Sequence, residues 1–182
     1  MEMSPTDLKA ALASWASGIA VVSTELNGIA DGITVSSFTS LSLDPPLVLA
    51  CLGSGSRLLP AIRQSGRFAV SVLAADQEEA SRHFATRGRN RAEGASNGSV
   101  GRQPGGMPTD PDAGFGTVPV VRTPDGQPRV GGAAAWLACT LEALLPQGDH
   151  HVVIGRVTAA GADEGRLPLL YFRRAYRAVA DR

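Results

Sequence analysis

The stretch 31–51 reads DGITVSSFTSLSLDPPLVLAC and changes character halfway along. Its first part, ITVSS at 33–37, alternates apolar and polar residues as a half-buried strand does, and it is rich in hydroxyl side chains. The second serine, Ser37, breaks this alternation, which predicts a bend or bulge where strand pairing stops and backbone groups become available. After the Pro45-Pro46 break, the continuous apolar run PLVLACL (46–52) predicts a strand buried on both faces.

Strand patterns continue on both sides of this stretch. IAVVST (19–24) precedes ITVSS, and the dipeptides Asn27-Gly28 and Asp31-Gly32 between them favour tight turns, which predicts an antiparallel hairpin. Further strand patterns are RFAVSVL (67–73), VPVVRT, AAAWLACTLEALL, HVVIGRVTAAG, PLLYF and YRAVA. Helices are expected at 4–18, 56–65 and 76–85. Antiparallel strands with a few inserted helices predict a mainly β fold, a small β-barrel with helical decoration.

The length of 182 residues predicts a single domain, 1–182, that contains a Gly- and Pro-rich loop at 87–117. The formal net charge is zero, so no overall positive field favours nucleic acid or an anionic membrane. The first residues lack the features of a secretion signal, and no apolar run is long enough to cross a bilayer. A cytoplasmic protein is therefore expected.

Rare residue types exclude several kinds of chemistry. Of the 17 Lys and Arg residues, Lys9 is the one lysine. Its context fits neither a phosphate-binding P-loop nor a pyridoxal Schiff base. Cys51 and Cys139 each lie in an apolar strand-like run, where a buried reduced thiol is expected rather than a disulfide or a zinc pair. The sequence has no metal-ligand spacing.

Two neighbouring segments have the composition of a binding site. The hydroxyls of Thr34, Ser36 and Ser37, beside free backbone amides, could match the mixed donor and acceptor edge of a heteroaromatic ring. A plain solvated strand edge is the competing interpretation. The run GSGSR (53–57) ends one predicted strand and opens a helix, so its amides, hydroxyls and guanidinium could bind a phosphate. Its competing interpretation is a flexible turn before a helix capped by Ser56.

His150 and His151 follow Gly148-Asp149 at the start of a predicted strand. Adjacent strand residues point to opposite faces, so the two imidazoles cannot chelate one metal, and at most one of them faces a site. On the residues alone, a histidine at a surface turn with no function is the favoured interpretation.

The order of these segments resembles the flavin reductase family, the small reductase partners of two-component flavin-dependent monooxygenases. The resemblance rests on ASGIAVVST, DGITVSSFTSLSLDPPLVLACL, SRLLPAIRQSGRFAVSVLAADQEEASRHFA, AAAWLACTLEA, GDHHVVIGRV and PLLYFRRAYR, taken together. It covers nearly the whole chain outside 87–117, a segment that looks longer and richer in Gly and Pro than the family would suggest.

The resemblance implies an antiparallel FMN-binding split barrel of Greek-key type that forms a homodimer. It also implies flavin contacts and nicotinamide contacts. The implied flavin contacts are Thr34, Val35, Ser36, Ser37, Cys51, Leu52, Gly53, Ser54, Ser56, Arg57, Phe84 and Ala85. The implied nicotinamide contacts are Asp149, His150, Tyr171 and Arg174.

The resemblance further implies reduction of free FAD or FMN by NADH, or by NADPH, with the reduced flavin leaving to serve a separate oxygenase. Because hydride passes directly between the cofactors, no catalytic side chain is expected, which explains the absence of a catalytic motif. Two alternatives stay open at this point. One is a flavin-binding module without turnover, and the other is a split-barrel oxidase of the pyridoxamine-phosphate oxidase type.

Overall fold

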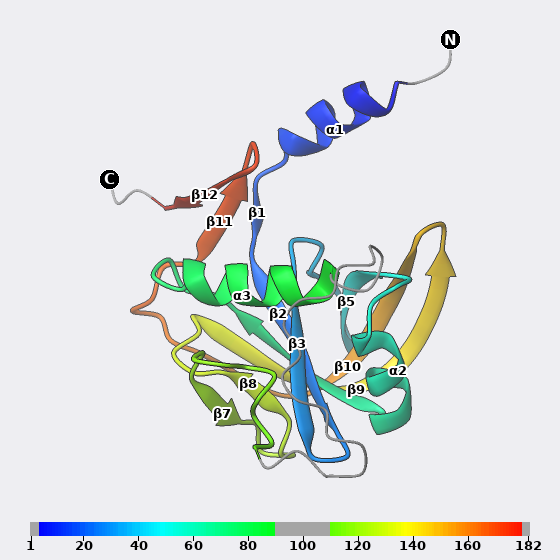
Figure 1. Cartoon of the computed structure of the whole chain (residues 1–182), viewed down its shortest axis with the longest axis vertical. Helices are drawn as coiled ribbons and strands as arrows, with labels where there is room; N and C mark the ends of the chain where they lie inside the picture. The colour runs from blue at the N-terminus through cyan, green and yellow to red at the C-terminus, as the bar shows by residue number, and fades with distance from the viewer. Residues whose placement is uncertain (1–3, 90–109, 180–182) are drawn as a thin grey trace.

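The computed structural model describes residues 4–89 and 110–179 and is built around one seven-stranded antiparallel sheet (Figure 1). The spatial strand order in this sheet is β3-β2-β6-β9-β10-β5-β4. Its strands are β2 (Ala20–Leu26), β3 (Ile29–Val35), β4 (Thr39–Leu43), β5 (Pro46–Gly53), β6 (Arg67–Val72), β9 (Ala135–Gln147) and β10 (His150–Ala162). The predicted mainly β, antiparallel fold with inserted helices is confirmed.

Two smaller sheets and three helices complete the part of the chain that the structure describes. One sheet joins β1 (Ser17–Gly18), β11 (Leu169–Phe172) and β12 (Ala175–Ala178), and the other joins β7 (Val120–Arg122) and β8 (Pro128–Val130). The helices are α1 (Pro5–Ala13), α2 (Leu58–Ser65) and α3 (Glu78–Arg89). None of these helices combines the length and apolar character that crossing a membrane requires.

The predicted hairpin forms between β2 and β3, and its turn is Asn27-Gly28. Both turn residues have positive φ, 54° and 72°, as the tight turns favoured in hairpins require. Asp31-Gly32, the second predicted turn dipeptide, instead lies inside β3, where Gly32 pairs with Ser23. Glycine is needed there for space, because a Cβ would stand 2.9 Å from the ring of Phe84 on α3.

A side chain joins the strands where backbone pairing stops. β3 ends at Val35 and β4 begins at Thr39, so the predicted interruption at Ser37 is confirmed as a bend. The Ser37 hydroxyl donates to the carbonyl of Cys51 on β5 at 3.0 Å and accepts from the amide of Cys51 at 2.9 Å. One hydroxyl therefore occupies both backbone hydrogen-bonding groups of Cys51 at this edge of the barrel.

Two apolar cores lie on opposite faces of β2. Val22 and Phe68 belong to the interior core, which α2 covers through Leu58 and Ile62. Val21 belongs to the outer core, which α3 covers. The outer core contains Ile19, Val21, Ala30, Leu73, Ala80, Phe84, Phe115, Val118, Val130 and Leu169. Because both of its faces are covered, β2 is buried from Ala20 to Thr24.

The prediction that the strand at 46–52 is buried on both faces needs correction. Val48, Ala50 and Leu52 are buried, but the residues between them are half-buried, so β5 has one core face rather than two. The apolar run misled because Leu47 and Leu49 are as apolar as the residues of the core face. The predicted helix after β5 does form, and Gly66 ends it in the left-handed conformation with φ 67°.

The structure differs from the predicted loop, 87–117, at both of its described ends. α3 continues to Arg89, and at the other end Phe115 is buried in the outer core, together with Val118 just beyond the predicted loop. The ring of Phe115 meets that of Phe84 edge to face at a centroid distance of 4.9 Å. The low apolar content of the whole segment concealed this local packing. The middle of the predicted loop, 90–109, lies outside the described residues.

Candidate functional site

The three hydroxyl side chains at the end of β3 make different contacts. Thr34 donates its hydroxyl to the Ser81 carbonyl of α3 at 2.7 Å, and the Ser37 hydroxyl holds both backbone groups of Cys51. Ser36 is exposed on the bend between them. The structure therefore uses two of the three predicted contacts to fix the strand end, and it leaves the Ser36 hydroxyl facing outward.

The turn after β5 has the open surface that a phosphate needs. A Cβ built on Gly53 or Gly55 would meet nothing within 4 Å. Ser56 is buried and its hydroxyl accepts from the amide of Leu58, but the N-cap of α2 is Arg57 rather than the predicted Ser56. The Arg57 guanidinium is engaged with Asp31 through bonds of 2.9 and 2.7 Å, so its charge is already matched by a carboxylate.

The structure holds the Asp149-His150 turn directly against this β5 turn. His150 pairs with Gly53 across the β10–β5 ladder, and the Ser54 amide donates to the Asp149 carbonyl at 2.8 Å. The His150 ring donates from Nδ1 to the Asp149 carboxylate at 2.7 Å, and this hydrogen bond lowers the pKa of Asp149. Because Nδ1 is the donor, Nε2 of the neutral ring stays available as an acceptor.

The remaining predicted flavin contacts lie close by but differ in access. The side chains of Val35, Leu52 and Phe84 are buried in the cores. Cys51 and Ala85 are half-buried, and Ser54 is exposed with its hydroxyl 3.2 Å from His151 Nδ1. Any ligand contact at Val35, Leu52 or Phe84 therefore involves the backbone, because their side chains are covered.

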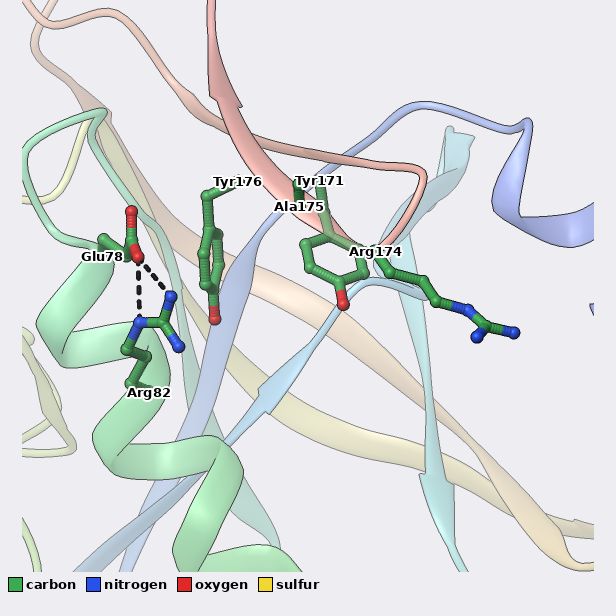
Figure 2. Close-up of a pocket in the computed structure, with 6 residues that line it drawn as sticks. All are labelled: Glu78, Arg82, Tyr171, Arg174, Ala175 and Tyr176. Atoms are coloured by element: carbon green, nitrogen blue, oxygen red, sulfur yellow. Dashed lines mark hydrogen bonds and ion pairs between the residues drawn. The ribbon is translucent and has the colours of Figure 1, made fainter.

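Tyr171 and Arg174, the other predicted nicotinamide contacts, line a cavity of about 350 Å³ at the β11–β12 hairpin (Figure 2). Its lining is Glu78, Arg82, Tyr171, Arg174, Ala175 and Tyr176. Asp149 and His150 are not part of this lining. The structure thus places the four predicted nicotinamide contacts at two different locations.

Sequence reasoning missed Tyr176, which connects this cavity to β3. Its hydroxyl lies 2.9 Å from the Ser81 hydroxyl, and the Ser81 carbonyl accepts the hydroxyl of Thr34. Arg82 lies over the Tyr176 ring at 5.0 Å from its centroid. For two other residues of this lining, Glu78 and Arg82, the sequence held a usable signal. They lie four residues apart in the predicted helix, and such pairs meet on one helix face.

Comparison with known proteins decides the family. A family model described as the flavin reductase like domain matches residues 12–180. The chain belongs to the flavin reductase family. The reductase component of 4-hydroxyphenylacetate 3-monooxygenase from Thermus thermophilus is 37% identical over 93% of this chain and 93% of its own length. An NADH-dependent flavin reductase from a Rhodococcus species is 35% identical over 98% of this chain and 88% of its own length.

A solved structure supports the same assignment. The NADH:FAD oxidoreductase of Streptomyces globisporus, in complex with NAD and FAD fragments, superposes with a TM-score of 0.78 at 32% identity. The match covers 99% of this chain and 97% of that one. This family membership agrees with the resemblance seen in the sequence.

The residues present fit a flavin. The open backbone at Gly53 and Gly55 can approach a phosphate closely, and the amides of Gly55 and Arg57 form no hydrogen bond within the described part of the chain. The exposed bend at Ser36 adjoins Ser37, whose hydroxyl bonds to Cys51, the residue two before Gly53. The flavin reductase chain therefore offers polar groups for a ring edge and for a phosphate at neighbouring points of one barrel edge.

Proposed function

We propose that the protein is a cytoplasmic NAD(P)H:flavin oxidoreductase, with residues 1–182 acting as one flavin reductase-like domain. It reduces free FAD or FMN with NADH or NADPH and supplies the diffusible product to a separate flavin-dependent monooxygenase. The observation that carries this proposal is the contact between two turns, in which the Ser54 amide donates to the Asp149 carbonyl. This contact brings the open turn at 53–57, which is the candidate phosphate site, next to His150.

The bound cofactors would supply the chemistry, which is hydride transfer from a nicotinamide to a flavin. The chain's own contribution is positioning, since two rings must meet at about 3–3.5 Å for such a transfer. The bend at 36–37 would hold one ring edge, the open turn at 53–57 the phosphate, and His150 the second cofactor. The names of the relatives, which are reductases and monooxygenase reductase components, support the reductase activity and the separate oxygenase.

The test is to mix the protein with excess FAD or FMN and NADH and to follow NADH absorbance. Flavin-dependent loss of NADH is expected. Flavin binding without that loss would overturn the reductase proposal and favour the non-catalytic flavin-binding module. Oxidation of pyridoxamine phosphate in place of NADH would favour the split-barrel oxidase.

Replacing His150 with alanine should raise the KM for NADH about fivefold and leave FAD affinity near the wild-type value, because the change removes one hydrogen-bonding group from the nicotinamide side. Steady-state kinetics at saturating FAD measures the first quantity, and quenching of FAD fluorescence the second. Gln147→Ala, at the end of β9 beside this turn, is the matched control, since Gln147 is exposed there. Equal KM values for the two variants would remove His150 from the site.

We also propose a homodimer, supported by the N-terminal helix. α1 begins after Ser4, whose hydroxyl caps it by accepting from the Thr6 amide, as predicted. The helix ends at Ala13 rather than at Gly18 and points away from the barrel (Figure 1). Leu12 on α1 and Trp15, two residues beyond its end, are 64% and 76% exposed, and no residue of α1 is buried. An apolar face of this kind is stabilised when a second copy covers it.

The double substitution Leu12→Glu with Trp15→Glu should therefore shift the protein from dimer to monomer, because it places two charges on that face. Light scattering after size-exclusion chromatography measures the change. Val121→Glu is the control, because Val121 is 42% exposed on β7, away from α1 in Figure 1. A double variant that stays dimeric would exclude α1 from the interface.

A further inference from the structure

The cavity between α3 and the β11–β12 hairpin combines three kinds of ligand-binding group. The rings of Tyr171 and Tyr176 line it and meet edge to face at a centroid distance of 5.4 Å. Figure 2 shows the Glu78–Arg82 pair on one side of these rings and Arg174 on the other. The cavity volume of about 350 Å³ is in the range of small-molecule sites.

The charges of this lining are unevenly matched. Arg82 donates from Nε and Nη2 to the same carboxylate oxygen of Glu78, Oε1, at 2.9 and 2.6 Å. Within the described residues, Glu78 Oε2 and the Arg174 guanidinium have no hydrogen-bond or ion-pair partner. The lining thus keeps one carboxylate oxygen as an acceptor and one guanidinium as an unmatched cation.

These groups correspond to the parts of an adenosine diphosphate moiety. Tyrosine rings stack on a flat heteroaromatic base, and an unmatched guanidinium attracts a diphosphate. In dinucleotide sites a carboxylate accepts from the ribose 2′-hydroxyl, whereas an arginine accommodates the 2′-phosphate that distinguishes NADPH. Here both an acidic and a basic side chain are present, and each is bound to the other.

We propose that this cavity holds the adenosine end of the nicotinamide dinucleotide and that Glu78 makes the enzyme prefer NADH to NADPH. The proposal rests on the proposed reductase function. Glu78 acts in two ways, since its carboxylate repels a 2′-phosphate and its bond to Arg82 occupies the guanidinium that would otherwise bind that phosphate. The preference therefore depends on an acidic residue and an arginine one helical turn apart on α3.

Glu78→Gln is the direct test. The substitution keeps the shape of the side chain, removes the negative charge and releases Arg82, so the net charge of the lining residues rises from +1 to +2. The ratio of kcat/KM for NADPH to that for NADH should rise about tenfold, the modest size expected of an exposed ion pair facing a phosphate dianion. Because the effect is electrostatic, it should shrink as ionic strength increases.

Two further variants fix the interpretation. Glu79→Gln is the matched control, because Glu79 is the next residue of α3 and does not line this cavity. It removes the same charge and should leave the ratio unchanged. Arg82→Ala should change the ratio in the opposite direction, because it leaves the Glu78 carboxylate unmatched.

The outcomes separate this inference from the proposed function. Flavin-dependent NADH oxidation by the wild type, with equal ratios in Glu78→Gln and Glu79→Gln, would overturn the role of Glu78 and leave the reductase standing. Absence of NADH oxidation in the wild type would overturn the reductase itself. Calorimetric titration with NAD⁺ and NADP⁺ gives a second readout, in which Glu78→Gln should tighten NADP⁺ binding and leave NAD⁺ binding unchanged or weaker.

Discussion

Replacing Phe84 with alanine should lower the free energy of unfolding by about 3–5 kcal/mol, the usual cost of truncating a buried aromatic side chain. The Phe84 ring is fully buried and stands at the centre of the outer core. It packs edge to face against Phe115 and covers Gly32 of β3. Removing it leaves a cavity under α3, and α3 carries Glu78 and Ser81 into the region of the candidate site. Chemical denaturation followed by fluorescence or circular dichroism measures the loss.

Phe84→Leu distinguishes a core role from a ligand contact. Leucine keeps most of the apolar volume, so the cost should fall to about 1–2 kcal/mol and FAD affinity should stay close to that of the wild type. A Phe84→Leu variant that keeps its stability but loses FAD affinity would show instead that the ring touches the flavin. The implied flavin contact at Phe84 would then be a side-chain contact, contrary to the burial of the ring.

The parts of the fold that depend on local chemistry could be predicted from the sequence. Asn27-Gly28 forms the hairpin turn, Ser4 caps α1 and Gly66 ends α2. Each of these features depends on the conformational preference of one or two residues, and a local pattern contains that information. The break in alternation at Ser37 was visible for the same reason.

The partners of the polar side chains could not be predicted, because they come from distant parts of the chain. Thr34 bonds to a carbonyl 47 residues away, and the hydroxyl of Tyr176 meets that of Ser81 across 95 residues. A hydroxyl-rich strand is compatible with binding a ligand and with binding its own fold, and only the three-dimensional arrangement separates the two. The family resemblance indicated the region of the site but could not divide these tasks among its hydroxyls.

The burial of some apolar side chains could not be predicted either, because it also depends on distant parts of the chain. Phe115 lies at the edge of a Gly- and Pro-rich segment, yet it is fully buried because α3 and β3 leave a space that its ring fills. Leu12 and Trp15 have the spacing of a core-facing helix, yet they are exposed in the single chain. In both cases the sequence shows that the residue is apolar and does not show which surface covers it.

Replacing Ser37 with alanine should lower the free energy of unfolding by about 1–3 kcal/mol, because the amide and the carbonyl of Cys51 both lose a hydrogen-bond partner. It should also weaken FAD binding about tenfold or more, since the bend at 36–37 and the turn at 53–57 are then no longer held in register. Denaturant titration measures the first effect and quenching of FAD fluorescence the second. Ser37→Thr keeps the hydroxyl and should restore most of both.

Ser36→Ala is the contrast, because Ser36 is exposed and next to Ser37. It should leave stability within about 0.5 kcal/mol of the wild type while weakening FAD binding, as expected of a hydroxyl that touches only the ligand. If Ser37→Ala leaves stability unchanged, the hydroxyl does not join β5 to the bend. If Ser36→Ala binds FAD as the wild type does, the hydroxyls of this strand end serve the barrel alone, and the flavin ring edge must be held by backbone groups.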